Sequence, residues 1–449
     1  MIDKLKDIWN LPLVKNTMTL SFSSAFMIFL PLVATPILSR IYTPEDYGEW
    51  GVFSSVLYIV CSFYFLSYEN TIVKTNDSEE VPHLLSLCTL IALGIIALII
   101  LIFVGGRITG NSFFCDFPSI FLLAISLITS AIYALYNCVA NREKQYGILS
   151  IASIICGISQ VSIRILLGII PVVAYGLIVG NILAQCIAVI FLTYHLSYIF
   201  HQSFLHDVSW TKIKAVAMKN KKFPLYDAPA RFIEFAIGNL AVILLSFFWS
   251  RDEIGCYSMI VQFILIPIAL IGSAMANVFY KELSESITDK TKIALTTTRA
   301  AKISFVISLF PILFLTFGGD HLLVIVLGDQ WISAGKMALC MVIYSVPLIL
   351  SEPLLPVFRS LDKQETRFKL NILCFCLSIG SLLISSLLTK DIYVVLIIYS
   401  TFYAFVRFLM YHAILKLAQI QISNISSYFI YAITFCYTAL AVRIYWDFF

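Results

Sequence analysis

Seven of the charged residues inside or at the edge of apolar stretches long enough to cross a bilayer are candidate site residues. A charge at the bilayer centre costs roughly 2.5–3.5 kcal/mol on the insertion scale, so such residues usually face a cavity or a partner. Arginine binds phosphate groups through bidentate, charge-assisted hydrogen bonds, whereas a carboxylate binds a proton or a metal cation. The arginines are Arg164, Arg231 and Arg407, the carboxylates are Asp227, Glu234 and Glu352, and the remaining charge is Lys336.

Arg164 lies within the apolar run 148–170. Either its guanidinium faces a cavity and binds an anion there, or its side chain extends toward the bilayer surface and contacts lipid phosphates. Lys336 lies only a few residues from the outer end of its run, and we expect it to snorkel to the interface.

Asp227, Arg231 and Glu234 are spaced i, i+4, i+7, which places them on one face of a helix. They form either a self-neutralising ladder of ion pairs or the charged wall of an inner vestibule. Pro224 and Pro229 favour a broken or bent entry into this helix, as at a transporter gate.

Glu352 stands in the sequence Ser351-Glu-Pro353, deep within an apolar run. Desolvation disfavours the charged form of a lone buried carboxylate, which would suit a proton-coupling site. The alternative is a structural ion pair with a residue such as Arg407. The neutral polar residues within the runs, including Gln160, Asn181 and Gln185, are expected to hydrogen-bond between helices.

The composition identifies a polytopic membrane protein. Of 449 residues, 60% are hydrophobic and 12% charged, with a mean hydropathy of +0.92. Soluble domains carry roughly 25% charged residues. The net charge of +4 is not gathered in a patch, so no nucleic-acid partner is expected. The eleven cysteines lie mostly within apolar runs and indicate small buried side chains, without disulfides or a metal site.

Apolar runs follow one another along the whole chain and predict an all-α fold, because a backbone in lipid must satisfy its own hydrogen bonds. Twelve runs are predicted to be spanning helices; the last is either a thirteenth span or part of a tail. The runs are 17–39, 47–68, 82–104, 117–138, 148–170, 173–196, 226–249, 254–280, 300–318, 332–357, 370–388, 391–414 and 426–446.

The distribution of Lys and Arg predicts the orientation. With the N-terminus on the cytoplasmic side, the inner segments hold 21 basic residues and the outer connections hold four. The four are Arg40, Arg107, Arg251 and Lys390.

An internal repeat divides the chain. Glu45, Asp46, Gly48 and Trp50 match Asp252, Glu253, Gly255 and Tyr257 at a constant offset of 207 residues. A second pair, Glu143-Lys-Gln145 and Asp362-Lys-Gln364, matches at an offset of 219. We therefore predict two parallel six-helix repeats: a bundle at 1–196, a basic cytoplasmic linker at 197–225, a bundle at 226–415 and a tail at 416–449.

Three motifs carry a family likeness: Leu38-Ser-Arg-Ile-Tyr-Thr-Pro-Glu-Asp-Tyr-Gly48, Glu253-Ile-Gly-Cys-Tyr-Ser258 and Asn141-Arg-Glu-Lys-Gln-Tyr146. In these stretches the chain resembles the bacterial polysaccharide and O-antigen flippases, in the group that also holds the MATE exporters and the lipid II flippase. The resemblance implies two bundles forming a V that works by alternating access in the bacterial inner membrane. It also implies a cargo of undecaprenyl diphosphate bearing an oligosaccharide, moved to the periplasmic leaflet and driven by a proton or sodium gradient.

From this likeness and the buried charges we expect Arg164, Arg231, Arg407 and Arg40 to contact the diphosphate, with Glu352, Glu234 and Asp227 in ion coupling or gating. The expected partners are the lipid-linked substrate, membrane lipids, a polysaccharide polymerase and a chain-length regulator, and the protein itself is expected to be a monomer.

Two alternatives remain. A cation-coupled drug exporter would share the fold but favour acidic residues in its cavity. A membrane glycosyltransferase or glycan polymerase would need a larger outer loop than 318–333, the longest present, and no nucleotide-binding GxxxxGK[ST] or zinc-binding HExxH motif occurs. We therefore expect neither catalysis nor a cofactor.

Overall fold

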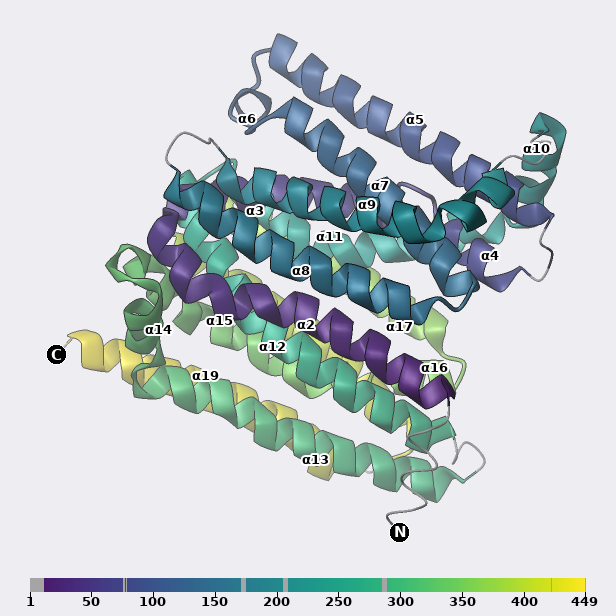
Figure 1. Cartoon of the computed structure of the whole chain (residues 1–449). Coiled ribbons are helices and arrows are strands. Elements are labelled where there is room, and N and C mark those ends of the chain that lie inside the picture. The colour runs from purple at the N-terminus through teal and green to yellow at the C-terminus, as the bar shows by residue number, and fades with distance from the viewer. Residues whose placement is uncertain are drawn as a thin grey trace. The chain divides into compact units, whose positions relative to one another are not determined.

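The computed structural model describes residues 12–75, 77, 79–170, 175–204, 209–284, 289–420 and 422–448. Every regular element within these ranges is helical (Figure 1). The prediction of an all-α membrane protein is therefore confirmed.

Thirteen helices in the described ranges have 18 residues or more, and each falls on one of the predicted apolar runs. They are α2 (Pro12–Ile41), α3 (Pro44–Phe63), α5 (Glu80–Ile108), α7 (Ile120–Arg142), α8 (Tyr146–Ile169), α9 (Gly176–Phe204), α11 (Ala228–Leu245), α12 (Arg251–Ser284), α13 (Lys290–Phe314), α15 (Ile332–Ser351), α17 (Gln364–Leu388), α18 (Ile392–Leu417) and α19 (Ile422–Phe448).

Shorter segments connect these helices. They are α4 (Glu69–Lys74), α6 (Ser112–Cys115), α10 (Trp210–Lys219), α14 (Asp320–Leu327) and α16 (Pro356–Ser360), with π-helical turns at Phe223–Asp227 and Leu315–Gly319 and 3-10 turns at Asp329–Trp331 and Glu352–Leu354.

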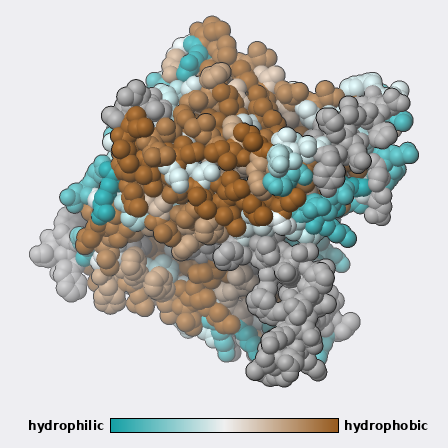
Figure 2. Space-filling view, in the orientation of Figure 1, coloured by the Kyte–Doolittle hydropathy of each residue, from teal (hydrophilic) through white to brown (hydrophobic). Residues whose placement is uncertain are grey.

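The long helices have the apolar surface that a bilayer requires. Across the described part of the chain, nine helices combine spanning length with high hydropathy, and residues 29–41, 317–327 and 428–443 form shorter apolar segments. One face of the molecule carries a broad band of hydrophobic side chains, with hydrophilic ones toward its ends (Figure 2).

The structure divides into two compact units, Met1–Tyr42 with Glu49–Phe235, and Thr43–Gly48 with Ala236–Phe449. In the first unit α8 packs along α9 and α2 (Figure 1). A core cluster joins Tyr136 and Ala140 of α7, Leu149 of α8, and Leu192 and Leu196 of α9. The boundary between the units falls within α11.

The second unit is organised around α15. This helix packs against α12, α13, α18 and α19, and residues from Cys340 to Ser351 are buried without interruption. A spanning helix covered on all sides by other helices is shielded from lipid, which is where polar residues can be kept in a membrane protein.

The duplicated turn is a duplicated helix cap. The backbone N–H and Oγ1 of Thr43 donate to Asp46 Oδ2 at 2.8 and 2.9 Å, and the Asp46 N–H donates back to Thr43 Oγ1 at 3.2 Å. Ser250 and Glu253 make the same three hydrogen bonds at 3.1, 3.0 and 3.4 Å. Both are capping boxes, and Ser250 follows Thr43 at the same offset of 207 residues.

The two glycines of this repeat lie in contact within the second unit, which contains the first turn of α3. A Cβ on Gly48 would stand 2.0 Å from the carbonyl oxygen of Arg251, and one on Gly255 would stand 1.7 Å from that of Pro44. Neither position has room for a side chain. The glycines recur because two helix N-termini cross there at backbone distance.

The second sequence match corresponds to a repeated backbone turn, but the predicted offset between the two copies is wrong by one residue. Lys144 and Asp362 both have positive φ, of 56° and 52°, and each lies two residues after the last residue of a helix, α7 or α16. The closing bonds, Gln145 N to Ala140 O at 2.8 Å and Lys363 N to Phe358 O at 2.7 Å, are equivalent at an offset of 218. The backbone turn, a Schellman-type helix end, repeats at 218, whereas the identical side chains align at 219.

Candidate functional site

Arg164 is buried between α8 and α9 in the first unit, with 6% of its surface exposed. Its Nε donates to the carbonyl oxygen of Leu177 at 3.1 Å, and its guanidinium carbon lies 4.4 Å from the ring centroid of Trp50. A Cβ on Gly180 would stand 2.6 Å from Arg164 Cγ. The cation is thus held by a carbonyl and an aromatic face, and the small residue on α9 makes the space for it.

A polar seam continues along α9 from Arg164. Gln160 Nε2 donates to Asn181 Oδ1 at 2.8 Å, joining α8 to α9. Ser130 Oγ of α7 donates to Gln185 Oε1 at 3.0 Å. The expectation that these neutral residues bond between helices is confirmed.

Arg231 of α11 forms an ion pair with Glu69 at the start of α4. The Arg231 side chain is 40% exposed and that of Glu69 is 14% exposed. Asp227 lies in the π-helical turn before α11, and both Asp227 and Glu234 are exposed. Arg231 therefore pairs across helices with Glu69, and of the predicted i, i+4, i+7 face only Arg231 and Glu234 lie in α11 itself.

Sequence reasoning missed Glu69 and His83. Glu69 directly follows the run 47–68 and was treated as part of a connection, although its Oε2 is buried without a hydrogen-bond partner among the described residues. His83, in the first turn of α5, is 5% exposed, and neither ring nitrogen has a hydrogen-bond partner within the described ranges. A titratable residue within one turn of an apolar run was the available signal.

Arg407 of α18 and Glu352 meet in the second unit. Arg407 donates to Glu352 Oε1 at 2.9 Å, to Ser351 Oγ at 3.2 Å and to the Tyr403 hydroxyl at 2.9 Å. Glu352 lies where α15 breaks into a 3-10 turn at Pro353, and its side chain is 33% exposed. The structural alternative that the sequence left open, a pair between these two residues, is present.

Arg40 and Lys336 are exposed. Arg40 is the basic residue of the last turn of α2, where a cation is favoured by the helix dipole. The predicted residues thus gather as Arg164 with its aromatic partner, Arg231 with Glu69, and Arg407 with Glu352.

A second buried ion pair was not predicted. Arg443 of α19 donates to Asp320 Oδ2 at 3.2 Å and contacts His321 Nε2 at 2.7 Å. The side chains of Asp320 and Arg443 are only 9% and 15% exposed. Asp320 follows Gly318 and Gly319 in a stretch that looks like a loop, which hid it from sequence reasoning.

An apolar cavity of about 510 Å³ lies in the second unit between α12, α13, α14 and α15. Gly272 and Pro353 line it, and a Cβ on Gly272 would stand 3.3 Å from Glu352 Cβ. Phe310, with 70% of its surface exposed, and Leu322, with 50%, line it as well. Its wall is suited to a hydrocarbon chain.

A helical protein with nine described helices long and apolar enough to cross a bilayer is a multi-pass membrane protein. The chain belongs to the family of polysaccharide biosynthesis proteins, whose profile matches residues 37–336. No curated protein sequence matches the chain.

The fold is similar to those of two solved membrane proteins. An inward-facing multidrug-resistance transporter of the MATE family has a TM-score of 0.62 and 14% identity, over 90% of this chain and 96% of that one. The lipid II flippase MurJ in an inward closed conformation has a TM-score of 0.58 and 12% identity, over 96% and 99%. At these identities the likeness shows the fold alone.

Proposed function

We propose that the protein is a flippase that moves an oligosaccharide linked to undecaprenyl diphosphate from the cytoplasmic to the periplasmic leaflet of the bacterial inner membrane. The observation that carries this proposal is a conjunction: membership in a polysaccharide biosynthesis family on a transporter fold. Polysaccharide assembly needs a transporter where a lipid-bound sugar unit must cross the bilayer.

The arginines supply the chemistry that a diphosphate requires. Arg231 is the most accessible of the three within spans, and a phosphate could replace Glu69 as its partner with no net loss of charge-assisted bonds. Arg40 is exposed at the end of α2, while Arg164 and Arg407 are largely buried. We assign Arg231 and Arg40 to direct contact, and Arg164 and Arg407 to contacts that need a change of conformation.

Energy coupling is assigned to the carboxylates. Glu352 is partly exposed beside Arg407, and Asp227 and Glu234 are exposed near Arg231. Protonation or cation binding at Glu352 would free Arg407 for the cargo, which links ion and substrate binding through one side chain.

The direct test uses the purified chain in liposomes with a fluorescent polyprenyl-diphosphate oligosaccharide. We expect time-dependent protection of the label from a membrane-impermeant quencher, accelerated by a proton or sodium gradient. A fluorescent cationic drug serves as the second substrate. If the liposomes transport the drug but not the glycolipid, the protein is a drug exporter and the flippase assignment is wrong.

The role of Arg231 is separable from its ion pair. Arg231→Gln should abolish transport, but it also leaves Glu69 without its partner. The double variant Glu69→Gln/Arg231→Gln removes both charges and restores neutrality. If Arg231 contacts the diphosphate, the double variant stays inactive at normal protein level, whereas recovery of transport would reduce the pair to a structural role.

A further inference from the structure

The basic connection before α11 contains a short helix with two distinct faces. Ile213 and Val216 of α10 are buried, at 5% and 7% exposure. Trp210, Lys214 and Met218 recur at i, i+4, i+8 and share another face of the helix. Trp210 is 70% exposed and Met218 61% exposed. The helix therefore packs with one apolar side and presents a second side that the described residues of the first unit leave exposed.

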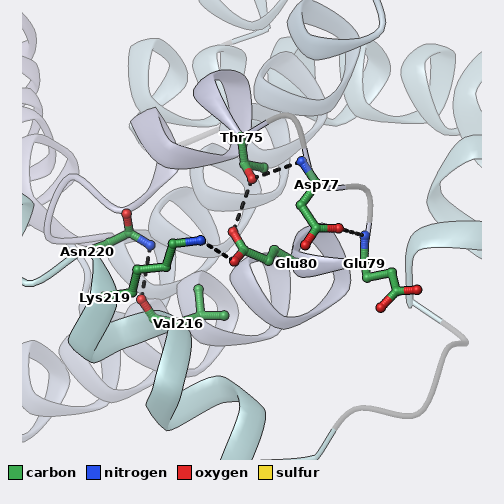
Figure 3. A network of polar contacts seen from close by, with 7 residues as sticks. All are labelled: Thr75, Asp77, Glu79, Glu80, Val216, Lys219 and Asn220. Atoms are coloured by element: carbon green, nitrogen blue, oxygen red, sulfur yellow. Dashed lines mark hydrogen bonds and ion pairs between the residues drawn. The ribbon is translucent and has the colours of Figure 1, made fainter.

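Specific contacts fix α10 at the start of a spanning helix. It packs against α5, and Lys219 forms an ion pair with Glu80, the first residue of α5 (Figure 3). Tyr68 donates its hydroxyl hydrogen to the Ala217 carbonyl oxygen at 3.1 Å. Glu80 is where the polar connection ends and the apolar span begins, so α10 is held at the level of the lipid headgroups.

The charges that the segment itself carries all have one sign. Residues 209–226 contain five lysines and neither Asp nor Glu. Lys212, Lys214, Lys221 and Lys222 are exposed, and the neighbouring Leu225 and Tyr226 are 63% and 70% exposed. Exposed aromatic and aliphatic side chains among lysines are typical of helices that lie in a membrane interface.

We propose that α10 and the following residues up to Tyr226 form a binding surface for anionic phospholipid headgroups of the adjacent leaflet. Trp210 and Met218 insert at the headgroup boundary, and the four exposed lysines of the surface contact lipid phosphates. Each lysine near the surface favours an anionic leaflet by roughly fivefold. The surface is separate from the proposed cargo residues, so it stands or falls independently of the flippase assignment.

The test places the full chain in nanodiscs of phosphatidylcholine, with or without phosphatidylglycerol carrying brominated chains. The fluorescence of Trp210 is obtained as the difference between the parent and Trp210→Phe. We expect the brominated anionic lipid to quench this component, and raising the salt to about 1 M, where screening acts within ~3 Å, to weaken the quenching.

Charge reversal supplies the matched comparison. Lys212→Glu/Lys214→Glu should reduce lipid quenching of Trp210 and raise its quenching by aqueous iodide about twofold, while Lys363→Glu/Lys369→Glu, at exposed lysines elsewhere, should change neither. Hydrogen exchange over 213–219 checks that α10 remains folded. If it does not, the salt dependence of the parent decides. Iodide access to Trp210 that is equal in both lipids would overturn the proposal and indicate an aqueous surface or a protein partner.

Discussion

At the scale of single residues, Arg407 shows how a spanning helix keeps a cation. Glu352, Ser351 and Tyr403 each accept a hydrogen bond from its guanidinium, and the Tyr403 ring centroid lies 5.2 Å from its central carbon. The three hydrogen bonds of Arg407 matter mainly as a complete set. Leaving one buried charge without its partner destabilises the fold more than removing both charges of the pair.

Arg407→Met should therefore destabilise the protein by about 1–3 kcal/mol. The loss stays below the 3–5 kcal/mol that is typical of breaking a fully buried pair, because the Glu352 side chain is 33% exposed and water can reach it. Thermal unfolding in detergent measures the effect. Lys336→Met, at an exposed lysine, is the control and should change stability by less than about 0.5 kcal/mol. Equal effects of the two substitutions would show that the Arg407 pair adds nothing.

At the scale of elements, repeated caps set where helices begin. Thr43 and Ser250 each cap a helix through a carboxylate three residues later, and Gly48 and Gly255 let the two capped turns cross. The acid, glycine and aromatic of the sequence repeat thus have a geometric cause, independent of any role in binding.

Gly255→Ala should destabilise this crossing by about 1–3 kcal/mol, because the new methyl group would overlap the Pro44 carbonyl oxygen and force the backbones apart. Gly94→Ala is the matched control within α5, where a Cβ meets nothing within 4 Å. That substitution should be neutral or stabilising by up to ~1 kcal/mol from helix propensity. Thermal unfolding and expression level report both variants, and a tolerated alanine at 255 would contradict the close crossing.

The attachment of α10 to α5 should depend on pH at the alkaline end. The hydrogen bond from Lys219 to Glu80, and then the charge of Glu80, raise the pKa of Lys219 above its usual 10.5. A raised pKa in the folded state means that the contribution is complete below the ordinary lysine pKa and is lost as the pH rises through the raised value. Above about pH 10.5, amide exchange in α10 should therefore accelerate.

Lys219→Met should produce the same acceleration at neutral pH, and should remove the alkaline change. Lys214→Met, on the open face of the same helix, controls for the loss of a lysine. If the protection of the α10 amides from exchange is unchanged both by Lys219→Met and by alkaline pH, Ile213 and Val216 hold the helix in place without the ion pair.

At the scale of the whole molecule, apolarity alone predicts the spans, because a chain in lipid has to bond its own backbone. The partners of the buried charges could not be predicted in the same way. The contacts of Arg164 with Trp50 and of Arg231 with Glu69 depend on which helices pack and in what register. Asp320 was hidden for a local reason, since Gly318 and Gly319 precede it and only the fold brings Arg443 to it. The helix caps could have been predicted from the sequence, because Thr43 and Ser250 are separated by the same 207 residues as their acidic partners Asp46 and Glu253.

The direction of α19 bears on which side of the membrane the end of this helix lies. Tyr428 lies beside Phe305 of α13, with ring centroids 5.1 Å apart, and further along α19 Arg443 pairs with Asp320, which follows α13. The two helices therefore run in the same direction, side by side (Figure 1). Because α18 ends at Leu417 and α19 runs from Ile422 to Phe448, we expect α19 to cross back through the bilayer, so that the last apolar run is a thirteenth span.

This geometry predicts that the ends of α18 and α19, residues 417 and 448, lie on opposite sides of the membrane. Alkaline phosphatase and green fluorescent protein, fused in turn after each residue, should give reciprocal signals, since the first is active only outside the cytoplasm and the second fluoresces only within it. With the orientation that the basic residues favour, phosphatase should be active after residue 448 and inactive after 417. The comparison between the two fusion points depends on α19 alone, so reports from the same side at both points would mean that this helix does not cross, whatever the orientation of the rest.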